Sequence, residues 1–221
     1  MRAIAIDGPA GAGKSSIAKI LAKRMGYIYV DTGALYRAVG YFVVSRNIST
    51  TNSDAVVACL DSVDVQMKYV DGQQRVFTNG EDVTDKIRTP EISMAASNVS
   101  AIPKVREFLF DLQQDIAKNN NVVMDGRDIG TVVLPNADVK IFLTASPEER
   151  AKRRYKELIE KGQSAVFEEV LADVITRDHN DSTRATAPLK QADDAVLIDT
   201  SDLDFEQSVE ALYKIAKEIG E

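Results

Sequence analysis

One short segment near the start of the chain restricts the fold more than any other. It reads Gly8-Pro9-Ala10-Gly11-Ala12-Gly13-Lys14-Ser15 and satisfies the phosphate-loop pattern G-x-x-x-x-G-K-[ST] in full. An apolar run, Ala3–Ile6, precedes it, and a helical pattern, Lys14–Met25, follows it. Backbone N–H groups in such a loop surround phosphate oxygens, and the helix N-terminus adds partial positive charge. Motif and context together predict a P-loop that binds a nucleoside triphosphate.

Side chains in and near the P-loop predict a phosphoryl donor and a bound metal ion. Lys14 is expected to reach the β- and γ-phosphates, and the Ser15 hydroxyl is expected to ligate Mg²⁺. A second metal ligand is Asp125, because it ends a hydrophobic run in the manner of a Walker B element. The sequence has no N-K-x-D motif of the kind that GTPases use to read guanine. We therefore predict ATP and Mg²⁺ as cofactors.

Five short apolar runs are typical of buried strands in a parallel sheet. They are Ala3–Ile6, Tyr27–Val30, Val122–Met124, Val139–Leu143 and Ala195–Ile198. Most are followed directly by Asp or Thr, and the carboxyl ends of parallel strands are where open α/β sheets bind ligands. Because helical patterns separate the runs, we predict an α/β protein. Its expected architecture is the three-layer P-loop NTPase fold with a central five-stranded parallel sheet.

The stretch from 61 to 120 interrupts the strand–helix alternation. Val63–Met67 alternates as a half-buried strand does, and the turn pairs Asp71-Gly72 and Asn79-Gly80 flank Gln74–Thr78. This predicts a small antiparallel sheet of about three strands, followed by two helices, the second starting near Pro103. We expect an insert over 61–120 within a kinase core of 1–60 and 121–221.

Two further helices are expected after the fourth apolar run. Ser146-Pro147-Glu148-Glu149 reads as a capping box that opens a helix running to Gly162. Another helix is expected over Val166–Asp178.

Composition limits the possible partners. The net charge of −7 argues against a protein that coats nucleic acid or an anionic membrane. No apolar stretch approaches the roughly 18 residues of a spanning helix, and no signal-peptide pattern precedes the first strand. The acidic surface and the lack of a heptad pattern favour a monomer. We expect a cytoplasmic monomer with no nucleic-acid or membrane partner.

Arginines follow the strands and the later helices, where a second phosphate needs them. Transfer from ATP to another phosphate brings two polyanions together, and the attacking oxygen is already an anion. Catalysis then requires neutralisation and alignment, which guanidinium groups supply, and no general base. The only histidine, His179, is therefore not needed. A lone helix arginine is usually a solvated surface residue, but Arg127, between Gly126 and Asp128 at a strand end, is a stronger candidate.

Six segments together resemble the bacterial (d)CMP kinases, also called cytidylate kinases, over nearly the whole chain. They are IDGPAGAGKSS (6–16), DTGALYR (31–37), NVSAIPKVRE (98–107), DGRDIGTVVLPNADVKIFLTAS (125–146), ERAKRR (149–154) and RDHNDSTRATAPL (177–189). The P-loop is common to many kinases, whereas the DGRDIGTVV segment together with the insert is far more specific. The resemblance implies a nucleoside monophosphate kinase with a core, a monophosphate-binding insert and a mobile lid at about 147–165, formed by the helix that the capping box at Ser146 opens.

The resemblance also implies roles for individual residues. The cytosine base would be read by Thr32, Arg106 and Asp128, and the ribose by Ser97 and Asp181. Arg37, Arg127, Arg177 and Arg184 would grip phosphates. Ser16 and Arg153 are expected to join the P-loop in binding ATP. The catalytic set is then Lys14, Asp125, Arg127, Arg177 and Arg184.

Three hypotheses remain open from the sequence. The leading one is phosphorylation of CMP and dCMP by ATP. A UMP- or shikimate-type P-loop kinase is the second, although a shikimate-type enzyme should carry Asp-x-Asp where this chain has Asp31-Thr32-Gly33. The third is a non-catalytic ATP-binding module, which would not need the arginine set.

Overall fold

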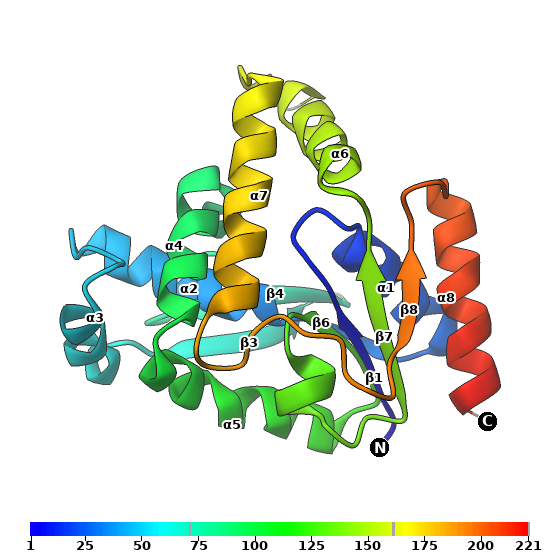
Figure 1. Ribbon diagram of the computed structural model, residues 1–221. Coiled ribbons are helices and arrows are strands. Elements are labelled where there is room, and N and C mark those ends of the chain that lie inside the picture. Colours follow the sequence, from blue (N-terminus) through cyan, green and yellow to red (C-terminus); the bar gives the residue numbers. More distant parts are fainter. Residues whose placement is uncertain (71, 161, 221) are drawn as a thin grey trace. The chain divides into compact units, whose positions relative to one another are not determined.

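The chain folds into two compact units. The computed structural model describes residues 1–70, 72–160 and 162–220, and for 219 and 220 only the backbone. The first unit comprises Met1–Tyr29 and Asn120–Glu221, and the second unit comprises Val30–Asn119. Their elements are labelled in Figure 1.

A parallel sheet forms the centre of the first unit. Its strands are β1 (Ala3–Asp7), β2 (Ile28–Asp31), β6 (Val122–Gly126), β7 (Val139–Thr144) and β8 (Val196–Asp199). The five strands lie in the order β2-β6-β1-β7-β8, and β2 crosses from the first unit into the second. Asp7 is in register with Gly126 on β6 and Phe142 on β7, so the carboxyl ends of three strands share one edge. The predicted five-stranded parallel sheet is confirmed.

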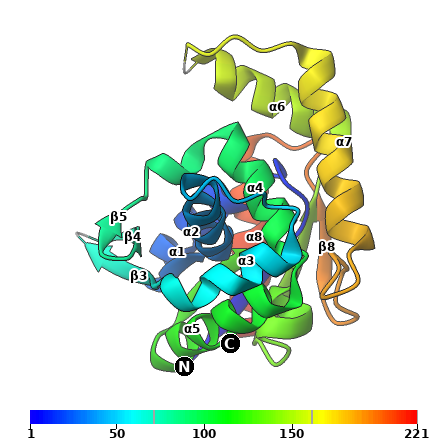
Figure 2. The same ribbon diagram turned by 90° about the vertical axis from the view of Figure 1, so that its left-hand side faces the viewer.

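Helices of the first unit are α1 (Lys14–Met25), α6 (Pro147–Glu160), α7 (Phe167–Thr183) and α8 (Phe205–Gly220), with a π-helical turn at Ile129–Val133. The core of the unit packs α1 and α8 against the sheet, and its fully or nearly fully buried members include Ile6, Leu21, Ile141 and Leu212. Figure 2 shows α6 and α7 side by side. A separate small apolar cluster, with Ala151, Leu158, Val170 and Val174, joins these two helices.

The boundaries of α6 and α7 differ in part from expectation. The N-terminal cap of α6 is confirmed, since the Glu149 N–H donates to Ser146 Oγ at 3.2 Å. The expected end of this helix includes Lys161, which lies outside the described residues. The expected end of α7 at Asp178 was wrong, because the helix continues to Thr183. The polar run after Asp178 resembles a loop in composition, but the Ser182 and Thr183 hydroxyls donate to carbonyls one turn earlier and stay within the helix.

A small antiparallel sheet lies in the second unit. It contains β3 (Val65–Val70), β4 (Gln73–Thr78) and β5 (Glu81–Asp82), in that order. Asn79 and Gly80 have φ of 50° and 81°, as the turn between β4 and β5 requires. Asp71, of the other expected turn, lies outside the described residues. The predicted sheet of three strands is confirmed.

Helices α2 (Thr32–Ser45), α3 (Ser53–Cys59), α4 (Pro90–Ser100) and α5 (Pro103–Asn119) complete the second unit, with short 3₁₀ turns at Leu60–Ser62 and Lys86–Arg88. Its core includes Leu35, Val39, Val99 and Leu109. The unit begins at Val30 and so contains α2 and α3 in addition to the expected insert. Within the described ranges, no helix combines the length and the apolarity needed to cross a membrane.

Candidate active site

The P-loop depends on glycine at its first position. Gly8 has φ of +147°, and a Cβ there would lie 1.9 Å from the Leu143 carbonyl oxygen on β7. Gly11 and Gly13 also have positive φ, at +77° and +89°. Glycine tolerates these conformations at no steric cost, and the loop can therefore turn tightly between β1 and α1.

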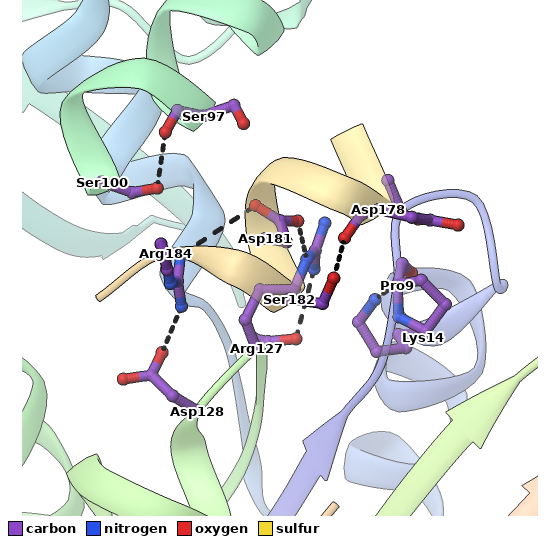
Figure 3. Close-up of polar contacts among 12 residues, drawn as sticks. Pro9, Lys14, Ser97, Ser100, Arg127, Asp128, Asp178, Asp181, Ser182 and Arg184 are labelled. Atoms are coloured by element: carbon purple, nitrogen blue, oxygen red, sulfur yellow. Dashed lines mark hydrogen bonds and ion pairs between the residues drawn. The ribbon is translucent and has the colours of Figure 1, made fainter. Parts of the chain in front are cut away.

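Lys14 lies buried at the start of α1. Its ammonium donates to the Pro9 carbonyl oxygen at 2.7 Å, as Figure 3 shows. Burial lowers its pKa, and the nearby positive charge of Arg127 lowers it further. A buried cation in this setting is stabilised by an anionic ligand, which is what a P-loop lysine binds.

Ser15 and Asp125 bring a hydroxyl and a carboxylate together beside the P-loop. Ser15 Oγ donates to Asp125 Oδ2 at 2.7 Å, and the Tyr29 hydroxyl lies 3.3 Å from Asp125 Oδ1. Mg²⁺ is bound in nucleotide sites by hard oxygen ligands, usually one or two carboxylates plus substrate phosphates. The chemistry of this pair therefore fits the expected metal.

Asp7 is a buried carboxylate that the sequence did not identify as a site residue. It ends β1 and accepts hydrogen bonds from the backbone N–H groups of Ile129 and Gly130, at 2.8 and 2.7 Å. Burial raises the pKa of Asp7 to about 6, although these two hydrogen bonds oppose the shift. Its position at the end of the strand before the P-loop was the available signal. Asp7 holds the start of the turn that follows Arg127 and Asp128.

Arg127 is paired with α7. Its Nε donates to Asp181 Oδ2 at 2.9 Å (Figure 3). Burial works against the charged forms of both groups, but mutual attraction outweighs it, so the pKa of Arg127 is raised and that of Asp181 is lowered. Arg184 lies 3.7 Å from Asp128 and 4.0 Å from Asp181, and Arg177 is near enough to lower the pKa of Asp181 as well. Five of the expected site residues therefore form one charged network.

Arg153 lies near the end of the P-loop. Its guanidinium donates to the Thr200 carbonyl oxygen at 2.7 Å and to Thr200 Oγ1 at 3.2 Å. A Cβ on Gly13 would lie 3.9 Å from Arg153 Nη1, so the arginine borders the loop. Ser16 is exposed on α1, and its expected contact with ATP stays a prediction.

In the second unit, Asp31 organises two arginines. It caps α2 by accepting from the Ala34 N–H at 2.9 Å, and it pairs with Arg37 at 2.8 Å and Arg88 at 3.0 Å. Burial alone would raise the pKa of Asp31, but the two guanidinium groups outweigh it and hold the pKa below its usual value. Arg88 was not identified from the sequence. Two cations, one of them the expected phosphate ligand Arg37, thus share one carboxylate.

The remaining expected substrate residues also lie in this unit. Thr32 is buried in the first turn of α2, and Arg106 is buried with its guanidinium carbon 5.3 Å from the centre of the Tyr36 ring. Arg106 Nη1 also donates to the Ser100 carbonyl oxygen at 3.3 Å. The buried Ser97 Oγ has no hydrogen-bond partner among the described residues. A buried hydroxyl in that state has the capacity to bind a ligand.

The expected site residues are thus divided between the two units. The second unit holds Thr32, Arg37, Ser97 and Arg106, whereas the first holds the P-loop, Asp125, Arg127, Asp128, Arg153, Arg177, Asp181 and Arg184. The roles assigned to them individually remain predictions. The buried Arg150 and the partly exposed Asp178 form an ion pair in the first unit, and neither was assigned a role from the sequence.

The sequence of this chain matches known proteins over nearly its full length. The family model for cytidylate kinase matches residues 4–218. The chain is 56% identical over 218 residues to the cytidylate kinase of Caldicellulosiruptor bescii, covering 97% of this chain and 96% of that protein. For the cytidylate kinase of Lactiplantibacillus plantarum, the identity is 49% over 212 residues, with coverages of 96% and 93%.

A solved structure supports the fold alone. An uncharacterized protein from Eubacterium ventriosum matches with a TM-score of 0.54 at 13% identity, covering 97% of each chain. The family assignment comes from the sequence matches, which are both extensive and strong. On this basis, the chain belongs to the cytidylate kinase family.

Proposed function

We propose that this chain transfers the γ-phosphoryl group of ATP to CMP and dCMP, producing ADP with CDP or dCDP. It is a nucleoside monophosphate kinase, in keeping with its family. The observation that best supports the chemistry is the nearness of two cations, the buried Lys14 and the partly exposed Arg127: burial lowers the pKa of Lys14, and repulsion from Arg127 lowers it further. Two like charges in one buried site are stabilised by a polyanion between them, and a transferring phosphoryl group is such an anion.

The reaction needs no general base. An anionic phosphate oxygen of CMP attacks the γ-phosphorus, the bond from that phosphorus to the β–γ bridging oxygen breaks, and ADP carries away the electron pair. Lys14 and the P-loop N–H groups stabilise the donor phosphates, and Arg127 stabilises charge on the transferring group. Ser15 and Asp125 would hold Mg²⁺, which supplies charge neutralisation on the donor phosphates when bound.

Roles in substrate binding are proposed for individual residues. Thr32, Arg106 and Asp128 would read cytosine, while Ser97 and Asp181 would bind the sugar. Arg37, Arg127, Arg177 and Arg184 would hold phosphates, and Arg153 and Ser16 would support ATP. Ser97 Oγ and Arg37 Nε are both buried and lack a hydrogen-bond partner among the described residues. The free hydroxyl supports the sugar-binding role of Ser97, and the free N–H supports the phosphate-binding role of Arg37.

The proposal also covers the roles of two segments, the oligomeric state and the location of the enzyme. Residues 61–120 would act as the monophosphate-binding insert, and 147–165 as the lid. The enzyme would work as a monomer in the cytoplasm, on small nucleotides. Sedimentation of the purified protein with and without nucleotides would test the monomer directly.

An acceptor panel tests the function. The protein is incubated with Mg·ATP and CMP, dCMP, UMP, AMP, GMP or shikimate, and ADP release is followed. Turnover with CMP and dCMP, and little with AMP or GMP, is the expected result. ADP release confined to shikimate would indicate the shikimate-type alternative, and no turnover with any acceptor would indicate a non-catalytic module.

A further inference from the structure

Arg150, in the first turn of α6, is a buried cation that the proposed reaction does not use. Its side chain is 3% exposed. Nε donates to the Ala145 carbonyl oxygen at 2.8 Å, and Nη1 donates to the Ala10 carbonyl oxygen at 3.1 Å and to Asp178 Oδ1 at 2.9 Å. Nη2 donates to the other Asp178 oxygen, so that the pair is bidentate. A guanidinium this deeply buried is tolerated only because these partners compensate its lost hydration.

The partners of Arg150 belong to three separate segments. Ala10 lies in the P-loop, Ala145 lies at the junction of β7 and α6, and Asp178 lies on α7. The P-loop also packs on the stem of the arginine, since a Cβ on Gly11 would approach Arg150 Cβ to 3.3 Å. One side chain therefore connects the proposed donor site to the helix that carries Arg177 and Asp181 and that is followed directly by Arg184.

Helix α7 is held by two ion pairs of the same kind, one helical turn apart. Asp178 binds Arg150, and Asp181 binds Arg127. The two arginines differ in exposure: 23% of the Arg127 side chain is exposed, whereas only 3% of the Arg150 side chain is exposed. Arg127 is accessible to a phosphate and can exchange its partner for one. Arg150 is enclosed by protein, although 27% of the Asp178 side chain is exposed, so we expect a phosphate not to reach this guanidinium and the pair to persist when ligands bind.

We propose that Arg150 is a positioning residue for phosphoryl transfer, which through Asp178 fixes α7 relative to the P-loop. This inference rests on the proposed function. In-line transfer requires the donor and acceptor phosphates to be aligned, and an error of about 1 Å can lower the rate by about 10²-fold. Neither Arg150 nor Asp178 is assigned a contact with nucleotide, so the effect passes through the P-loop, through Arg177 on α7 and through Arg184 directly after it.

The most selective variant is Asp178→Asn. It removes the charge from the α7 side of the pair and leaves the contacts of Arg150 with Ala10 and Ala145 available. Asp173→Asn, the same chemical change at an exposed position of α7, is the matched control. We expect Asp178→Asn to lower kcat for CMP by about 10-fold or more, while KM for ATP changes by less than about 3-fold. Asp173→Asn should match the wild type in both constants.

A double-mutant cycle with Arg150→Lys tests whether the two side chains act together. Lysine keeps the charge but loses the bidentate geometry, so this variant should also lower kcat. The double variant should be no slower than the slower single variant, since both remove one interaction. Additive losses would contradict the inference. If Asp178→Asn does not fold, Asp178→Glu replaces it, and normal kcat in that variant would also count against the inference.

Controls separate this inference from the proposed function and from a purely structural role. Absence of CMP turnover by the wild type would overturn the proposed function. With an active wild type, the inference fails if Asp178→Asn matches Asp173→Asn in kcat. It also fails if the variant has a lower Tm but unchanged kcat per folded molecule. A drop in kcat at temperatures well below Tm supports it.

Discussion

Ser15 Oγ donates a 2.7 Å hydrogen bond to Asp125 Oδ2, joining the last residue of the P-loop to a strand more than a hundred positions away. The pair combines a hydroxyl with a buried carboxylate, which are oxygen donors suited to Mg²⁺. It is the feature of the first unit that most directly links the sequence motif to the proposed use of Mg²⁺.

Asp125→Asn should therefore weaken metal use. The amide keeps the size of the side chain but removes its negative charge, so we expect kcat to fall by about 10²-fold and the Mg²⁺ concentration for half-maximal rate to rise. Rates measured across a Mg²⁺ titration check this. Asp115→Asn, an exposed carboxylate on α5, is the control. An unchanged Mg²⁺ requirement in Asp125→Asn would contradict the assignment.

Arg127→Ala should act mainly on kcat. An arginine that stabilises the transferring phosphoryl group can be worth about 10³–10⁵ in rate, whereas substrate affinity should change less. The variant also leaves buried Asp181 without its closest cation, so Tm should fall as well. Steady-state kinetics measured below that Tm give kcat and KM for the folded variant. Arg24→Ala, which breaks an exposed ion pair with Glu210, should have no effect on kcat. Unchanged kcat in Arg127→Ala would mean that its role is misassigned.

Asp7 should make folding stability depend on pH in an unusual direction. Its pKa is raised from 3.8 to about 6, so the folded state binds the proton more tightly than the unfolded state between these values. The contribution of Asp7 to the free energy of unfolding should thus decrease as pH rises from about 4 to 6, by up to roughly 3 kcal/mol.

Urea unfolding of the wild type and of Asp7→Asn at several pH values isolates this contribution. The wild-type free energy of unfolding minus that of the variant should fall across the window from pH 4 to 6 and level off above it. A difference that stays constant, or that rises with pH, would show that Asp7 does not carry a raised pKa.

Gly8→Ala tests the geometry of the P-loop. The added methyl group would lie 1.9 Å from the Leu143 carbonyl oxygen, so the loop must shift. Gly26→Ala is the matched control, because Gly26 also has positive φ, at +68°, but a Cβ there meets nothing within 4 Å. Backbone strain alone should cost the control about 1–2 kcal/mol.

Gly8→Ala should be less stable than this control by about 2 kcal/mol or more and should lose measurable ATP binding. Urea unfolding and calorimetric titration with ATP supply the two readouts. Equal stability of the two variants, with normal ATP affinity, would contradict the role given to Gly8.

The sequence predicted those features that are encoded locally. The P-loop and the strands before and after it follow from a contiguous motif and short apolar runs, and the Asn79-Gly80 turn follows from two residues that favour positive φ. The end of α7 was wrong because its polar last turn is stabilised by side-chain contacts that composition does not show.

Pairings across long stretches of chain could not be predicted. Asp7 accepts from an N–H group 122 positions later, and Arg150 meets Asp178 at a separation of 28. Nothing in one sequence selects these partners among the many acidic and basic residues available. The burial that makes Asp7 and Arg150 distinctive arises only once the sheet and helices have packed.

Product analysis tests the central claim most directly. The protein is incubated with ATP labelled in its γ-phosphate, Mg²⁺ and equimolar CMP and AMP, and the labelled nucleotides are separated by chromatography. The account predicts that the label appears in CDP, with little in ADP made from AMP, and that dCMP in place of CMP yields labelled dCDP. Label that remains in ATP, or that is released only as inorganic phosphate, would contradict it.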